Sequence, residues 1–273
     1  GEEGGRIVLH NRNPRGEMPF LDHLEELRWR IFKAAGALVL ATVLGFYLIQ
    51  RFQVLRLLVA PVSEYLPDGR LIYLSPVDPF FFLLKTSVLL GVILAFPILL
   101  YQVWAFLSPA LEKREKRVIV PALYGGLVLF AAGVVLAYEI ALPVSLRFLN
   151  GIQIDFLQAS LTANDYLSFV TRLLVAFGLI FELPVVVLIL SVLGLVTPRF
   201  LRSKRRHAIV IITVLASLLS PGDLIMVTVI MMVPLIFLYE LSILLSALVY
   251  RKRAEERELE PSQEAPPGAV EMR

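Results

Sequence analysis

Long apolar runs alternate with short charged segments along the chain. A bilayer core roughly 30 Å thick takes about 20 apolar residues as a helix, and helices and closed barrels are the folds that satisfy the backbone in lipid. Barrel strands alternate in polarity, whereas these runs are continuously apolar. The pattern predicts an all-α membrane protein with six transmembrane helices, at about 29–50, 86–107, 118–140, 166–192, 207–220 and 224–249.

The fifth predicted span is unusually short. Its uncharged run from Ala208 to Ser220 makes a helix of only about 20 Å. Two arrangements fit this length. The run forms a re-entrant hairpin with the sixth span, or it crosses where the bilayer thins or water enters.

Prolines lie in or beside several spans. Each removes a backbone donor and bends its helix, so we expect several proline-kinked helices and a concave body. The two halves of the chain show no self-similarity, which argues against an inverted-repeat transporter. The prolines are Pro97, Pro121, Pro143, Pro184 and Pro234.

The segments outside the spans divide the chain into three parts. Residues 1–17 are expected to be a flexible segment, 18–250 the six-span domain, and 251–273 a charged, proline-rich and disordered cytoplasmic tail. In the long segment 51–84, Phe52–Ala60 is predicted to be an interfacial helix.

Basic residues are distributed asymmetrically about the spans. Four segments carry 20 of the 26 lysines and arginines, and the intervening segments on the other side carry four. By the positive-inside rule, the four basic segments and both termini are cytoplasmic. The four segments are 1–33, 112–117, 199–206 and 251–273.

The composition and the missing motifs argue against several classes of function. The chain is 58% hydrophobic and 18% charged, has no cysteine and carries a net charge of +3, too small to indicate a nucleic-acid partner. Metal-binding, phosphate-loop and Gly-x-Ser-x-Gly patterns are missing from the sequence. We therefore expect a protein that is not an enzyme and uses no metal or cofactor.

Glu182 is the most unusual polar residue, because it lies inside an apolar span, two residues before Pro184. An intramembrane carboxylate is costly and marks a functional site by default. The alternatives are an internal ion pair or a protonated carboxyl. Glu240 is expected to reach the interface by snorkelling, and Asp223 to cap the sixth span.

Two cytoplasmic segments combine acidic and basic residues. Residues 18–30 form an amphipathic stretch in which Glu26 and Arg30 are an i,i+4 pair. Residues 111–117 contain Glu112 and Glu115 among four basic residues. The plain interpretations are an interfacial helix and a basic inside loop. The carboxylates also suit a receptor for cationic side chains.

Motifs in these segments and in the spans resemble the TatC family, the multispanning core of the twin-arginine protein translocase. Any one motif is weak, but together and in this order they are specific, and they cover roughly residues 18–250. The motifs are His23–Arg28, Tyr101–Phe106 leading into Pro109–Leu111, Glu115–Arg117, Tyr166–Phe169, Ala176–Gly178, Phe181–Pro184 and Ser220–Asp223.

The resemblance implies a function, partners and a shape. Family members recognise signal peptides with two adjacent arginines and recruit single-span TatA- and TatB-like subunits. Folded cargo then crosses the prokaryotic cytoplasmic membrane at the expense of the proton-motive force. Other copies of the chain and membrane lipid are further expected partners. The family also implies a glove-like body with six spans and both termini in the cytoplasm.

The resemblance also implies a signal-peptide site. A guanidinium pairs bidentately with carboxylates, and by motif position these are Glu26 and Glu115, tuned by Arg28 and Lys113. Glu25 and Glu112 are neighbours that could substitute. Phe106 and Leu111 complete the expected site, with Phe106 as an apolar wall.

The implied membrane site consists of Glu182, Asp223 and Thr228. Family members often carry Gln early in span six, where this chain has Leu224–Thr228. We hypothesise that Thr228 replaces that polar group.

A transporter is the alternative function. It would be a proton- or cation-coupled solute transporter with Glu182 as its ion site, and it predicts flux through the purified protein alone. A receptor predicts arginine-dependent peptide binding without flux. An intramembrane enzyme lacks the residues it needs.

Overall fold

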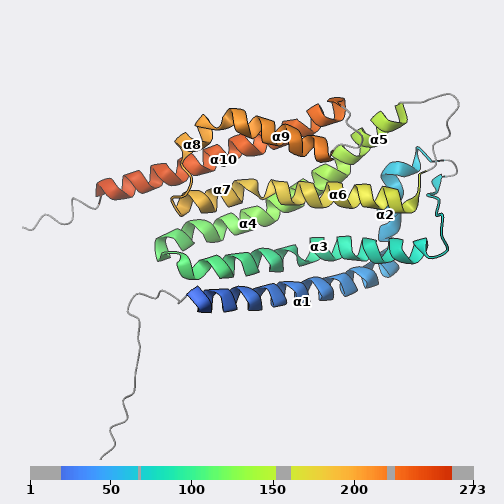
Figure 1. Cartoon of the computed structure of the whole chain (residues 1–273), viewed down its shortest axis with the longest axis horizontal. Coiled ribbons are helices and arrows are strands. Elements are labelled where there is room, and N and C mark those ends of the chain that lie inside the picture. The colour runs from blue at the N-terminus through green and yellow to red at the C-terminus, as the bar shows by residue number, and fades with distance from the viewer. Residues whose placement is uncertain (1–19, 67–68, 152–160, 220–224, 260–273) are drawn as a thin grey trace, which may run out of the picture.

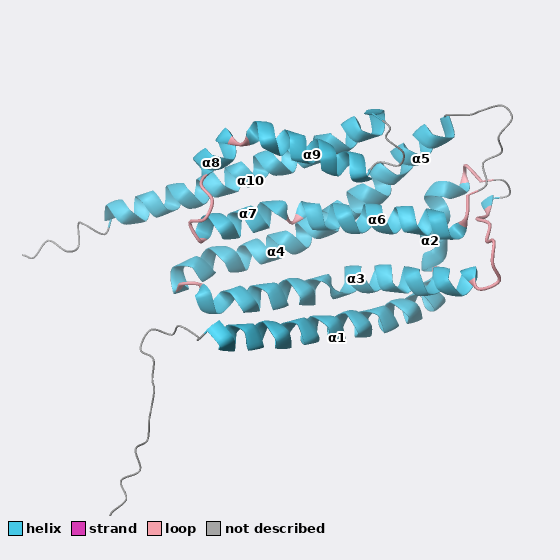
Figure 2. Cartoon of the chain, in the orientation of Figure 1, coloured by secondary structure: helices cyan, strands magenta, loops and turns pink. Residues whose placement is uncertain are grey.

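The computed structural model of the chain describes residues 20–66, 69–151, 161–219 and 225–259, and these ranges are helical without a strand (Figure 2). The elements are α1 (Phe20–Phe52), α2 (Val54–Ser63), α3 (Asp78–Leu107), the 3-10 turn η2 (Ser108–Ala110), α4 (Lys113–Leu136), the π-helical turn η3 (Ala137–Ala141), α5 (Leu142–Gly151), α6 (Ala163–Phe181), α7 (Leu183–Val192), α8 (Pro198–Ser203), α9 (Arg205–Leu219) and α10 (Ile225–Leu259).

The predicted all-helical membrane fold is confirmed. Five stretches are long and apolar enough to cross a bilayer within the described ranges, and each overlaps one of five predicted spans. The other predicted span, 207–220, corresponds to α9, which has only 15 residues. It packs against α10.

The described parts of the four basic segments lie at one end of the molecule. Figure 1 shows the start of α1, the turn between α3 and α4, helix α8 and the last turns of α10 at this end. Helix α2 and the starts of α3 and α6 lie at the opposite end. We call the first of these the basic end.

Two helices begin earlier than their apolar runs. Helix α1 starts at Phe20, so the amphipathic stretch joins the first span without a break instead of forming a separate interfacial helix. Helix α3 starts at Asp78, whose carboxylate accepts the backbone N–H groups of Leu74 and Ser75 at 3.0 and 2.9 Å. Charged residues end an apolar run, but they do not end a helix that extends beyond the lipid.

Helix α10 ends later than predicted. It continues to Leu259, into the segment expected to be a disordered tail. Residues 251–259 are rich in Arg, Lys, Glu and Ala, which have high helix propensity. The helix therefore extends past the point where the apolar pattern stops.

Glycines allow α1 and α3 to approach closely. A Cβ on Gly45 would lie 2.9 Å from the backbone oxygen of Ser87, and one on Gly91 would lie 2.8 Å from the backbone of Thr42. Small residues at such contacts are typical of helix packing in membranes, where close approach provides the attraction.

The centre of the protein is built by α4, α6 and α7. Phe177 and Leu167 of α6 are fully buried, and a Cβ on Gly133 of α4 would lie 2.8 Å from the backbone oxygen of Phe177. Phe130 of α4 stacks on Phe96 of α3, with ring centroids 3.5 Å apart. Helices α6 and α7 are thus the most enclosed of the spans.

Prolines affect the helices unequally. Helices α3, α4 and α10 continue through Pro97, Pro121 and Pro234. By contrast, the fourth span divides into α6 and α7 at Glu182, immediately before Leu183 and Pro184. A π-helical turn precedes Pro143. This break places the carboxyl of Glu182 at a joint in the centre of the fold.

Candidate functional site

The first turn of α1 and the last turn of α3 meet at the basic end. The His23 ring of α1 stacks on the Phe106 ring of α3, with centroids 4.3 Å apart and planes inclined by 15°. Stacked rings of this kind fix the relative position of the two helix ends. They place the expected apolar wall, Phe106, beside the acidic turn that contains Glu26.

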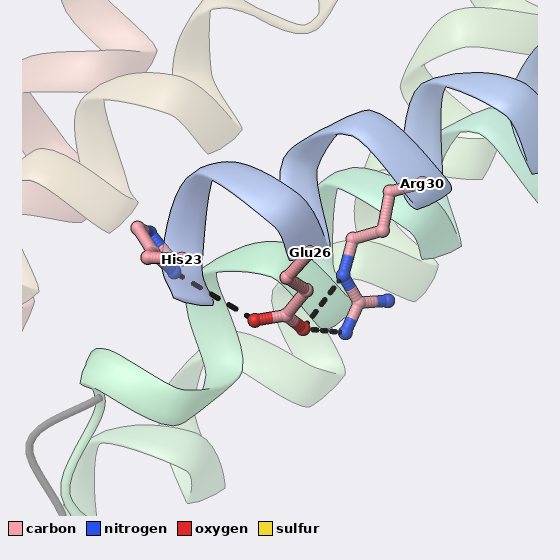
Figure 3. A network of polar contacts seen from close by, with 3 residues as sticks. All are labelled: His23, Glu26 and Arg30. Atoms are coloured by element: carbon pink, nitrogen blue, oxygen red, sulfur yellow. Dashed lines mark hydrogen bonds and ion pairs between the residues drawn. The ribbon is translucent and has the colours of Figure 1, made fainter. Parts of the chain in front are cut away.

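Glu26 lies in a network of three side chains (Figure 3). Nε of Arg30 donates to Oε1 of Glu26 at 2.9 Å, and Nη2 of Arg30 donates to the same oxygen. Nδ1 of His23 is 3.6 Å from the other oxygen, Oε2. Oε2 is buried and has no hydrogen bond to any residue that the structure describes.

This network is more enclosed than a surface ion pair. The side chains of Glu26 and Arg30 are each 20% exposed. Water screens such a pair less than it screens an exposed one. The site can therefore hold a cation at Glu26 with charge-assisted hydrogen bonds.

The second expected carboxylate lies in the first turn of α4. The backbone N–H of Glu112 donates to Oε2 of Glu115 at 3.0 Å, as part of a capping box. The capping box fixes the direction of Glu115. The negative charge also lies at the N-terminus of α4, where the helix dipole favours it.

The other expected residues of this site divide into exposed and buried groups. Arg28 is exposed and its guanidinium lies over the Phe32 ring, 5.7 Å from the centroid. Lys113 is exposed at the start of α4. Leu111 is 6% exposed and belongs to a core cluster with Ile119 and Val192. Leu111 is thus part of the packing beneath the site rather than of its surface.

Glu182 lies in the interior of the bundle. Its side chain is buried, and neither carboxylate oxygen has a hydrogen-bond partner within the described ranges. A Cβ on Gly126 of α4 would lie 2.7 Å from Oε2 of Glu182. The missing side chain at Gly126 therefore makes the space that the carboxyl occupies.

The remaining expected polar residues differ in burial and in their partners. Thr228 of α10 is 9% exposed, and Asp223 lies outside the described residues. Glu240 pairs with Arg205 of α9, whose Nη2 donates to Oε2 at 2.7 Å. Both of these side chains are about half exposed, and the snorkelling of Glu240 to the membrane interface stays a prediction.

The roles of two residues of these sites, His23 and Gly126, were not predicted from the sequence. The sequence does not indicate that His23 stacks on Phe106, because this contact depends on how α1 packs against α3. Gly126 was detectable only as a small residue in an apolar span, a common mark of close helix contact. Groups of three or more metal-ligating side chains are absent from the described part of the chain.

Comparison with protein families gives a match over most of the chain. The family model described as Sec-independent protein translocase protein (TatC) matches residues 22–234. The chain is 40% identical to the Sec-independent protein translocase protein TatC of Aquifex aeolicus over 240 residues, which are 87% of this chain and 98% of that protein. It is 34% identical to TatCy of Bacillus subtilis over 246 residues, 86% of this chain and 92% of that protein.

Two solved structures are similar in fold. One is a crystal structure of the twin arginine translocase receptor TatC, with a TM-score of 0.71 and 41% identity over 83% of this chain and 98% of that chain. The other, of the same receptor in DDM, has a TM-score of 0.72 and 39% identity over 82% of this chain and 99% of that chain.

Proposed function

Because the chain belongs to the TatC family of Sec-independent protein translocase proteins, we propose that it is the signal-peptide receptor and core of a twin-arginine translocase. It resides in a prokaryotic cytoplasmic membrane with both termini and the whole basic end in the cytoplasm. Signal peptides of folded cargo bind at this end. TatA- and TatB-like single-span subunits then join, and cargo crosses with the proton-motive force.

The observation that carries this proposal is the acidic turn of α1 held against the end of α3. His23 and Phe106 stack at 4.3 Å, which places Glu26 beside an apolar ring. A twin-arginine signal peptide combines a guanidinium pair with a following apolar segment. A carboxylate next to an apolar wall matches that order.

Glu115 is proposed as the second carboxylate. It lies in the first turn of α4, five residues after the short turn that follows α3. One carboxylate on α1 and one on α4 offer one acceptor for each arginine. Arg28 and Lys113 carry like charge to the peptide, so they limit how long it stays bound.

Glu182 is proposed to act at a later step. A buried acceptor without a donor favours any polar group that enters the membrane face of the bundle. The polar part of a recruited subunit or of the inserted signal peptide supplies such a group. Thr228, and Asp223 outside the described residues, are proposed to serve the same surface, together with lipid and other copies of the chain.

A binding measurement tests the receptor. Affinity of a labelled twin-arginine signal peptide for the purified protein is compared with that of the same peptide carrying Lys-Lys. Glu26→Gln and Glu115→Gln are each expected to weaken Arg-Arg binding about tenfold or more, since each removes a charge-assisted pair. Glu64→Gln, an exposed position after α2 at the opposite end, is the control and should leave binding unchanged. Equal affinity for both peptides, or indifference to both Glu variants, rejects the site.

The unpartnered carboxyl of Glu182 is the observation that favours the second candidate, a proton- or cation-coupled transporter. The measurement is proton flux in vesicles that contain the purified protein alone, with and without Glu182→Gln. Flux that depends on Glu182 supports the transporter. Proton flux no greater than that of protein-free vesicles rejects the transporter.

A further inference from the structure

The resting protein already carries a guanidinium on the proposed receptor carboxylate. Nε and Nη2 of Arg30 both donate to Oε1 of Glu26. This is the chemical group that the twin-arginine motif brings. We propose that Arg30 is an internal competitor that a signal-peptide arginine must displace from Glu26. The inference rests on the proposed receptor function.

The bonding of Glu26 is incomplete in a way that an incoming ligand can improve. Arg30 places two donors on one oxygen, and Oε2 is left buried without a hydrogen bond among the described residues. A guanidinium that approaches from outside the helix can bond both oxygens in a parallel fork. The exchange therefore replaces a one-sided pair with a two-sided one.

His23 controls access to the unused oxygen. Its Nδ1 lies 3.6 Å from Oε2, and its ring covers Phe106. Figure 3 shows His23 and Arg30 on opposite sides of the Glu26 carboxylate. When His23 moves aside, Oε2 and the Phe106 ring open together. The arginine of one peptide then binds at Oε2 in the same step in which its apolar segment packs on the Phe106 ring.

The competitor sets a threshold that a lysine peptide meets less well. An arginine that displaces Arg30 restores the same charge and at least as many hydrogen bonds. A lysine ammonium is a strongly hydrated point charge without the planar fork, so it exchanges a better-matched partner for a poorer one. Displacing Arg30 costs both peptides the same free energy, so the competitor lowers both affinities by one factor. The weaker peptide then needs a correspondingly higher concentration to bind.

The simpler role for Arg30 is helix stabilisation, because Glu and Arg at i,i+4 support an isolated helix. The two roles predict opposite effects on binding. If the pair only holds Glu26 in place, removal of Arg30 weakens the binding of the Arg-Arg peptide. A competitor makes its removal strengthen the binding of both peptides by the same factor.

The test measures affinities of the Arg-Arg and Lys-Lys peptides for the purified full chain in four forms besides wild type. These are Arg30→Gln, Arg30→Lys, Lys33→Gln and Glu26→Gln. Lys33 is exposed on the same helix, so Lys33→Gln removes an equal charge without freeing Glu26. Arg30→Lys keeps the charge and a helix-favouring residue, which protects the test if Arg30→Gln folds poorly.

The expected result is a gain of affinity. Arg30→Gln strengthens binding of both peptides about tenfold, the value of one charge-assisted pair, and leaves the ratio of the two affinities unchanged. Arg30→Lys strengthens both by less, and Lys33→Gln, which leaves the Glu26 pair in place, gains clearly less affinity than Arg30→Gln. The inference is overturned if Arg30→Gln gains no more affinity than Lys33→Gln, or weakens the Arg-Arg peptide.

Failure of the receptor function has a different signature. In that case wild type shows no preference for Arg-Arg, or Glu26→Gln keeps the preference, and the inference falls with it. A wild-type preference that requires Glu26, with affinities that Arg30→Gln does not raise, leaves the receptor intact and rejects the competitor alone.

Discussion

Two carboxylates of this protein, Glu26 and Glu182, are held in opposite ways. Glu26 has a cationic partner, lies at the basic end and has a 20% exposed side chain. Glu182 lies between α6 and α7, is 8% exposed, and has no hydrogen-bond partner among the described residues. The first carboxylate is surrounded by charge and the second by close packing.

One chain can in this way separate two kinds of recognition. A partnered carboxylate at an aqueous end can exchange one cation for another at small net cost, because the charge stays paired throughout. An unpartnered polar group in the bundle costs free energy until a donor arrives. Glu26 therefore suits selection of a charged peptide, and Glu182 suits a polar contact formed within the membrane.

The largest expected effect tests the packing around Glu182. Gly126→Val places a side chain where even a Cβ would lie 2.7 Å from the carboxylate. Overpacking of this kind costs about 1–3 kcal/mol, which should lower the thermal unfolding temperature in detergent. Gly125→Val is the matched control, since a Cβ there meets nothing within 4 Å. Equal shifts for the two variants would show that Glu182 is not held by this contact.

A second variant separates the contribution of Glu182 to function from its effect on the stability of the protein. Glu182→Leu removes an unsatisfied buried polar group, so the unfolding temperature should stay the same or rise. Export of a twin-arginine cargo, in cells that lack their own copy, should fall about tenfold if a polar contact worth about 1.4 kcal/mol is lost. Binding of the signal peptide should stay within about twofold of wild type. Unchanged export, or an unfolding temperature as low as that of Gly126→Val, contradicts this account.

A smaller effect is expected at the apolar wall beside Glu26. Phe106→Ala removes the ring on which His23 stacks, and aromatic pairs contribute about 0.5–1.5 kcal/mol. Affinity for the Arg-Arg peptide should weaken several-fold, measured by the same binding assay. Phe80→Ala, at the exposed start of α3, should leave it unchanged. A stronger affinity in Phe106→Ala would mean that the ring obstructs the site.

The smallest effect is expected at the exposed pair of α9 and α10. Arg205 donates to Glu240 at 2.7 Å, but both side chains are about half exposed. Arg205→Gln should change the free energy of unfolding by less than about 1 kcal/mol, and peptide binding should not change. A loss as large as that of Gly126→Val would mean that α9 depends on this pair.

The positions of the helices could be predicted from the sequence, because a long apolar run indicates a segment that crosses lipid. Their ends could not, because they depend on local hydrogen bonds such as the cap that Asp78 makes with Ser75. The pairing of Glu26 with Arg30 was predictable from i,i+4 spacing on one helix. Both termini in the cytoplasm and the glove-like shape stay predictions.

The contacts between helices lay beyond the sequence pattern. Gly126 meets Glu182 only because α4 and α6 pack in one register, which side-chain shapes set along the whole interface. The same applies to His23 and Phe106, which are far apart in the chain. The sequence thus indicated candidate residues for the two sites, and packing decides which of them face each other.

Crosslinking can locate the bound arginine pair directly. A photoreactive group beside the two arginines of a signal peptide is crosslinked to the purified full chain, and the attachment sites are mapped. Attachment is expected at the first turns of α1 and at the junction of α3 with α4, competed by free Arg-Arg peptide and reduced in Glu26→Gln. Attachment around the joint of α6 and α7 at Glu182, with the first turns of α1 unlabelled, would contradict this expectation.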